Sequence, residues 1–75
     1  MNSVQCKMAR VATGLGVREL AAIADVSPNT IARMERGEAL RNTTIETLRN
    51  ALEGVGVTFL DDDGHGAGVR YKGVA

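Results

Sequence analysis

Residues 17–37, VRELAAIADVSPNTIARMERG, decide the fold of this 75-residue chain. Ser27 followed by Pro28 is a strong helix start, because serine can cap the first free amides and proline gives up a hydrogen bond that this position does not need. Apolar side chains recur on one side of each half of the stretch: Leu20, Ala21 and Ala24 before the serine, Ile31 and Met34 after it. The spacing predicts two short helices, over residues 17–24 and 28–36, joined by a tight turn in a helix-turn-helix.

A further helix is predicted on the N-terminal side, over about Ser3 to Thr13, with Gly14 as its stop. Its apolar stripe, at a spacing near 3.6 residues, consists of Val4, Met8, Val11, Ala12 and Leu15. Cys6 lies off this stripe, so we expect an inert or mildly exposed thiol.

Another helix is predicted on the C-terminal side, where Thr43 and Glu46 have the spacing of a capping box and Gly54 supplies the stop. Its apolar stripe consists of Ile45, Leu48, Leu52 and Val55. Two short strands are then predicted, over residues 57–60 and 69–72, with a turn-rich loop between them. A lone hairpin is marginal in water, so it needs either the helical body or a symmetry mate to lie on. The expected fold is mainly α, with a four-helix domain over residues 1–56 and a strand or hairpin extension over 57–75.

Size and composition predict one small domain with an aliphatic core, since Phe59 and Tyr71 are the only aromatic residues. A domain this small gains from dimerisation. The chain has no apolar run approaching the ~20 residues of a membrane span, and its N-terminus lacks a secretory pattern. A single cysteine, Cys6, cannot form an internal disulfide. We therefore expect a cytoplasmic protein with no membrane partner.

The formal net charge is zero, which at first argues against a polyanionic partner. Residues 1–60 carry seven lysines and arginines against six acids, and the tail carries two against three. A domain this weakly basic can bind DNA only if its positive residues gather on one face, and it should bind nonspecific DNA poorly.

One face of the helix over residues 28–36 carries Asn29, Arg33 and Arg36, and the opposite face carries Ile31 and Met34. Asparagine can pair with adenine and arginine with guanine through two hydrogen bonds each. Pro28 and Ala32 border this face, and their small side chains allow the helix backbone to come close to the bases. We expect Asn29 and Arg33 to read the bases. The alternative is an ordinary solvated helix face, and the hypothesis requires that the arginines are not bonded to neighbouring acids.

Glu35 falls at the margin of the apolar side, where an unpaired carboxylate would be costly. Arg10 on the first predicted helix is the candidate partner, and loss of either residue would then cost roughly 3–5 kcal/mol. In the alternative, Glu35 points to solvent beside Arg36.

The stretch from Arg10 to Leu52 resembles the helix-turn-helix family of the lambda and 434 phage repressors and Cro, the XRE family. The matching residues are Arg10, Gly14-Leu15, Glu19-Leu20-Ala21, Ala24, Val26-Ser27, Thr30-Ile31, Met34-Glu35, Gly37 and Leu48. The resemblance implies a repressor-like fold of five helices or a trimmed version, which binds a palindromic operator as a homodimer. It also implies the Arg10–Glu35 link and base contacts from Pro28, Asn29, Ala32 and Arg33. The expected phosphate ligands are Arg18, Ser27, Arg36, Arg41, Asn42, Thr43 and Thr44.

Three departures from the family pattern matter. Val17 stands where a phosphate-binding glutamine is usual, and Asp25 stands where the turn usually has glycine, although aspartate tolerates the left-handed conformation. The usual fifth helix is replaced by the strand-like tail, which resembles antitoxin members whose strands pair across the dimer. The residues expected at such an interface are Val57, Phe59, Leu60, Val69 and Tyr71.

Other signals are weak. The run Asp61–Asp63 lacks the alternating acids of a calcium loop, so a polar turn is the better interpretation. His65 has no catalytic partner, and no nucleophile, base and oxyanion site assemble, so we expect no enzyme, metal or cofactor. The leading hypothesis is a DNA-binding transcriptional regulator. The alternatives are an antitoxin whose tail binds a partner protein, and a helix-turn-helix that has lost DNA binding.

Overall fold

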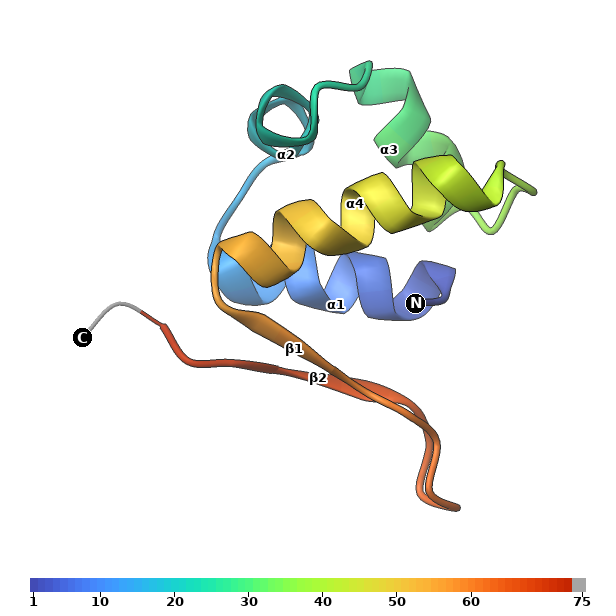
Figure 1. Ribbon diagram of the computed structural model, residues 1–75, viewed down its shortest axis with the longest axis vertical. Helices are drawn as coiled ribbons and strands as arrows, with labels where there is room; N and C mark the ends of the chain where they lie inside the picture. The colour runs from blue at the N-terminus through green and yellow to red at the C-terminus, as the bar shows by residue number, and fades with distance from the viewer. Residues whose placement is uncertain (74–75) are drawn as a thin grey trace.

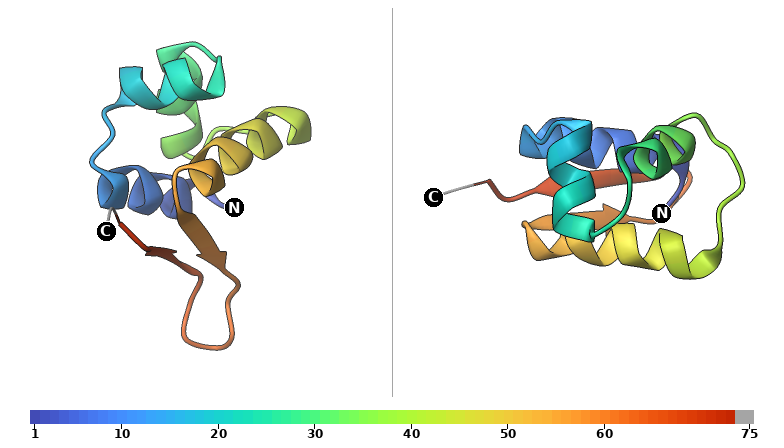
Figure 2. Two further views of the ribbon diagram at one scale, coloured as in Figure 1. Left: turned by 60° about the vertical axis from the view of Figure 1, so that its left-hand side comes forward. Right: turned by 90° about the horizontal axis from the view of Figure 1, so that it is seen from above.

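The computed structural model describes residues 1–73 and shows four helices standing on a β-hairpin (Figure 1). The elements are α1 (Ser3–Thr13), α2 (Val17–Ala24), α3 (Pro28–Glu35), α4 (Asn42–Gly54), β1 (Val57–Leu60) and β2 (Gly68–Tyr71). α1 and α4 lie side by side above the hairpin, and α2 and α3 lie farther from it (Figure 2). The predicted mainly helical fold with a C-terminal strand pair is confirmed.

The helix boundaries follow from local chemistry. Gly14, with φ of 78°, ends α1, and Ser27 caps α3 by accepting a hydrogen bond from the Thr30 amide at 3.2 Å. Asp25 adopts the left-handed conformation expected of it, with φ of 57° and ψ of 47°. The predicted bounds of α1 and α2 are confirmed, and α3 ends one residue earlier than predicted.

The capping box predicted at the start of α4 is wrong. α4 begins at Asn42, and its N-cap is Arg41, whose side chain makes no capping hydrogen bond. Thr43 therefore lies inside the helix, where its carbonyl accepts a hydrogen bond from the Thr47 hydroxyl at 2.9 Å. The spacing of Thr43 and Glu46 identified the helix but placed its start two residues too late, since the N-cap is Arg41 and not Thr43.

The apolar stripe predicted for α1 is also wrong. The buried residues of α1 are Gln5, Cys6 and Ala9, whereas Val4 and Val11 are each 63% exposed. The core under α1 is filled by large side chains from the other helices: Leu20, Ile31, Leu48 and Leu52. The small side chains of Cys6 and Ala9 allow α1 to approach this core closely. Side-chain size, and not the number of apolar residues on a face, therefore decides which face of α1 is buried.

The hairpin lies on its own helical body. Its strands pair antiparallel within the chain, with Val57 opposite Tyr71 and Phe59 opposite Val69. Opposed residues share a face of the sheet, and this face is turned inward. Val57 and Phe59 are buried, and Val69 and Tyr71 pack against the same core.

The buried amide of Gln5 fastens the hairpin to α1. Its Nε2 donates to the carbonyls of Leu60 and Gly68, both at 3.0 Å, and its Oε1 accepts from the Asn2 amide. The apolar side chains expected at a dimer interface are thus already used within one protomer, with Leu60 only half-buried. A partner that docks on the hairpin would meet its outer face or its edges.

Within residues 1–73, no helix combines the length and the apolar character needed to cross a membrane.

Candidate nucleic-acid interface

The outer face of α3 is free of the protein body. Ile31 and Met34 are buried, whereas Pro28 and Asn29 at the start of the helix are exposed. Ala32 is half-buried, and the side chain of Arg33 is 42% exposed. The second helix of the motif is therefore clamped by its apolar side and turns the predicted base-reading residues outward.

The start of α3 is held by a cap and a turn. The Val26 amide donates to the Ala21 carbonyl at 3.0 Å, which closes the turn after α2. The Ser27 hydroxyl also lies 3.0 Å from the Thr30 hydroxyl, so this predicted phosphate ligand is already engaged as a helix cap. Ser27 remains exposed, and its hydroxyl and amide lie at the helix start where anions bind.

A hollow of about 340 Å³ runs beside α3, between this helix and the start of α4. Its lining residues are Val26, Thr30, Arg33, Ala39, Leu40, Arg41 and Thr44. One predicted base reader, Arg33, thus shares a surface with two predicted phosphate ligands, Arg41 and Thr44. Asn42 and Thr43 are exposed next to them in sequence, and Arg18 is exposed on the first turn of α2, outside the hollow.

An inner ion pair joins α3 to α1. Arg10 Nε lies 2.7 Å from Glu35 Oε2, and Arg10 Nη2 lies 2.9 Å from Glu35 Oε1. Arg10 Nη1 also donates to the Leu15 carbonyl at 3.2 Å. The two side chains are only 16% and 10% exposed. The structure thus contains the Arg10–Glu35 link expected from sequence, and Glu35 does not point to solvent beside Arg36.

This buried pair changes the acid–base properties of its surroundings. The hydrogen bond to Glu35 raises the pKa of Arg10, so the guanidinium stays charged. Burial, helped by the Glu35 charge, raises the pKa of Cys6 to about 11. Of the two expectations for Cys6, an inert or a mildly exposed thiol, the exposed one is wrong: Cys6 is fully buried and protonated at neutral pH.

An outer ion-pair cluster occupies the opposite side of α3. Arg33 Nε lies 3.2 Å from Glu38 Oε1, and Arg36 Nη2 lies 2.6 Å from Glu38 Oε2. The two guanidiniums, Arg36 foremost, hold the pKa of Glu38 below its usual range. The requirement that these arginines are not bonded to neighbouring acids is therefore not met, because both are bonded to Glu38.

Sequence reasoning missed Glu38 because it lies beyond the end of α3, where a helical wheel does not apply. The available signal was Gly37, whose left-handed stop turns the chain back over the helix. Arg33, Arg36 and Glu38 are all substantially exposed, at 42%, 59% and 44%. Exposed ion pairs contribute little to stability, so the requirement set from the sequence is too strict: these arginines can exchange their partner for DNA.

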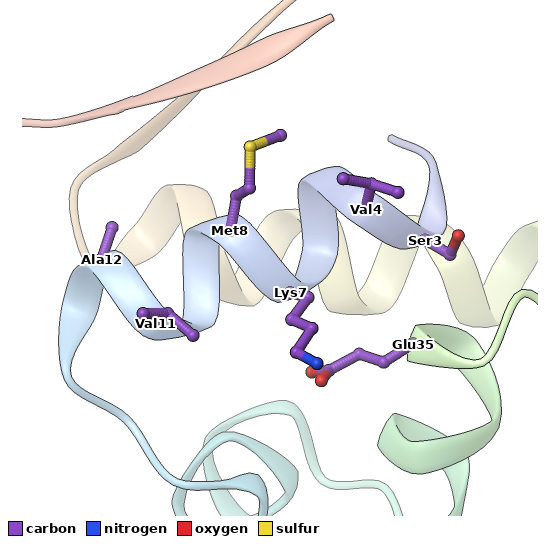
Figure 3. A pocket seen from close by; sticks show the side chains of 7 residues that line it. All are labelled: Ser3, Val4, Lys7, Met8, Val11, Ala12 and Glu35. Atoms are coloured by element: carbon purple, nitrogen blue, oxygen red, sulfur yellow. The ribbon is translucent and has the colours of Figure 1, made fainter.

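A second hollow, of about 440 Å³, lies along the exposed side of α1. Figure 3 shows Val4, Met8 and Val11 along the helix and the Lys7 side chain extending toward Glu35. These are the apolar residues that the sequence pattern assigned to the core.

The acidic loop of the hairpin makes a polar turn. The Asp62 carboxylate accepts hydrogen bonds from the amides of Gly64 and Gly66, at 2.8 and 2.9 Å, and these bonds lower its pKa. Across residues 1–73, no cluster of three or more histidine, cysteine, aspartate or glutamate side chains could hold a metal ion.

The fold and this exposed second helix define a helix-turn-helix DNA-binding domain. A family model described as helix-turn-helix matches residues 7–61, which is more than half of the chain. The chain belongs to this family, the XRE-type proteins that include the lambda repressor and Cro, and it is a DNA-binding regulator of that type. The search of curated proteins found no match for the chain.

Proposed function

We propose that this protein is a sequence-specific transcriptional regulator, a repressor or autoregulator, that inserts α3 into the major groove of DNA. The observation that carries the proposal is the outer face of α3, which is exposed over its first turn and shares a hollow with the start of α4. Helix-turn-helix proteins present base-reading residues from the N-terminal part of the second helix.

Four residues are proposed to face the base pairs. Asn29 and Arg33 have the donors and acceptors for two-bond contacts with adenine and guanine. Pro28 and Ala32 lie beside them, and their small side chains let the α3 backbone approach the bases.

The proposed phosphate ligands surround this face. Arg41 and Thr44 line the hollow beside α3, and the neighbouring Asn42 and Thr43 are exposed. Arg18 and Ser27 lie at the starts of α2 and α3, and Arg36 lies at the end of α3. Contacts of this kind fix the register of the protein on DNA and make affinity depend on salt.

We further propose that the protein binds a palindromic operator as a homodimer, as the family relationship suggests. Two recognition helices would then enter successive major grooves about 34 Å apart. The side chains proposed for the dimer contact are those of the hairpin, of which Leu60 is the candidate least committed to the protomer's own core. Val57 and Phe59 are buried, so they would support such a contact by packing behind the contacting side chains and would not touch the partner themselves.

Selection of bound sequences from a random DNA pool tests the proposal. The expected result is an enriched motif with two half-sites related by two-fold symmetry, bound by a dimer in analytical ultracentrifugation. A single unrepeated motif would contradict the palindrome and leave sequence-specific binding in place. A pool with no enrichment, combined with weak binding at low salt, would contradict the proposed function.

A further inference from the structure

The chain folds back over the last turn of α3 through a glycine stop. Arg36 caps the helix, and Gly37 follows with φ of 83°. The Gly37 amide donates to the Met34 carbonyl and the Glu38 amide donates to the Arg33 carbonyl, both at 3.1 Å. This pair of hydrogen bonds is the Schellman motif. It ties the backbone of Glu38 to that of Arg33, so the end of the helix itself places the Glu38 backbone within reach of Arg33 and Arg36.

Glu38 binds the two arginines in different ways. Arg33 reaches the carboxylate through Nε alone, at 3.2 Å from Oε1. Arg36 uses two nitrogens, with Nε at 2.8 Å and Nη2 at 2.6 Å from Oε2. In residues 1–73, the two terminal nitrogens of Arg33 make no hydrogen bond with protein, so a two-bond contact with guanine is still open to it.

The place of Glu38 is electrostatically unfavourable on other grounds. A carboxylate at the C-terminus of a helix meets the negative end of the helix dipole. A carboxylate on the face proposed to approach phosphates also opposes DNA binding. Because both effects disfavour an acid here, its contacts with Arg33 and Arg36 are the interactions that account for its position.

We propose that Glu38 is a specificity-determining positioning residue of the DNA interface. It holds Arg33 by one nitrogen, with the other two free for a base, and it competes for Arg36 with the phosphates of nonspecific DNA, whereas in the complex with the selected sequence Arg36 contacts a phosphate. The inference rests on the proposed function. Its consequence is a lower affinity for nonspecific DNA and a sharper preference at the base pair that Arg33 reads.

The test compares Glu38→Gln with a matched control, Glu53→Gln. Glu53 pairs with Arg49 on α4, with Arg49 Nε 3.4 Å from its Oε2, so the control removes the same charge and frees an arginine away from α3. Both variants and the wild-type chain are titrated with two duplexes: the sequence that the wild-type chain selects from a random pool, and a scrambled duplex of the same length. Binding is measured between 50 and 200 mM salt.

We expect Glu38→Gln to bind the scrambled duplex more tightly than the wild-type chain does. Between 50 and 200 mM salt, its affinity for this duplex should fall by about threefold more than that of the wild-type chain, as one added phosphate contact requires. Its preference at one base pair of the selected sequence should fall, and Glu53→Gln should match the wild-type chain in both respects. Equal salt dependence and base preference in all three proteins would overturn the inference.

A double variant separates positioning from charge. If Glu38 acts through Arg33, Glu38→Gln should change base preference in the wild-type chain and have no further effect in Arg33→Ala. An undiminished effect in the Arg33→Ala background would overturn the positioning role. Failure of the wild-type chain to prefer any sequence would instead overturn the proposed function, and this inference with it.

Discussion

Two arginine–carboxylate clusters flank the second half of α3, and they differ chiefly in exposure. The inner pair, Arg10 and Glu35, has two short hydrogen bonds and side chains 16% and 10% exposed. The outer cluster joins Arg33 and Arg36 to Glu38, with every side chain more than 40% exposed. The same chemical groups therefore have different roles on the two sides of one helix.

Burial decides what each cluster can do. A buried pair has given up its hydration, so neither member can leave without stranding the other. An exposed cluster keeps its hydration, contributes little to stability and can change partners. The inner pair therefore fixes α3 to α1, and the outer cluster leaves its arginines available to a ligand.

The largest expected effect comes from breaking the inner pair. Glu35→Ala leaves the Arg10 guanidinium buried without a partner and should lower the free energy of unfolding by about 3–5 kcal/mol. Urea denaturation followed by circular dichroism measures this loss. The matched variant Glu38→Ala should stay within about 0.5 kcal/mol of the wild-type chain. Similar losses in the two variants would contradict the distinction between the clusters.

A buried but uncharged group tests whether burial or charge sets the cost. Gln5→Leu removes the amide that donates to the carbonyls of Leu60 and Gly68, and these carbonyls then lose a partner. The expected loss is about 1–3 kcal/mol, between those of Glu35→Ala and Glu38→Ala. Hydrogen exchange of the β1 and β2 amides should also speed up. Unchanged exchange there would show that Gln5 does not hold the hairpin.

Removing an outer arginine should affect binding and spare the fold. Arg33→Ala is expected to weaken binding to the selected sequence by about 1–3 kcal/mol and to relax preference at one base pair. Fluorescence anisotropy with single-base variants of the duplex measures both changes. Arg49→Ala, which removes a half-buried arginine from α4, away from α3, serves as the control. Equal losses in the two variants would remove Arg33 from base recognition.

The smallest expected effect is that of pH on the outer cluster. Because the pKa of Glu38 is depressed, its carboxylate stays ionised as the pH falls from 7 to 5, and its contacts are lost only below its lowered pKa. The salt dependence of DNA binding should therefore stay flat across this range. If the wild-type chain at pH 5 acquired the steeper salt dependence expected of Glu38→Gln, the depressed pKa would be contradicted.

Local patterns predicted the helix-turn-helix well, because Ser27-Pro28, Asp25 and Gly37 each specify a backbone conformation at a helix end. The Arg10–Glu35 link was also predictable, because a carboxylate at the margin of an apolar face needs a cation. The face of α1 was not predictable from periodicity, since Cys6 and Ala9 are buried for their small size while larger apolar residues stay exposed. The role of Gln5 depends on contacts between α1 and the hairpin, and the position of Glu38 depends on the path of the chain beyond α3. A helical wheel includes neither.

The arginine Nε–H signals in nitrogen-edited NMR spectra test the distinction between the two clusters most directly, because each reports on one guanidinium. On titration with the selected duplex, we predict that the signals of Arg33 and Arg36 shift while that of Arg10 stays in place. Shifts confined to other parts of the chain, with Arg33 and Arg36 unmoved, would contradict the assignment of the outer face of α3 to DNA.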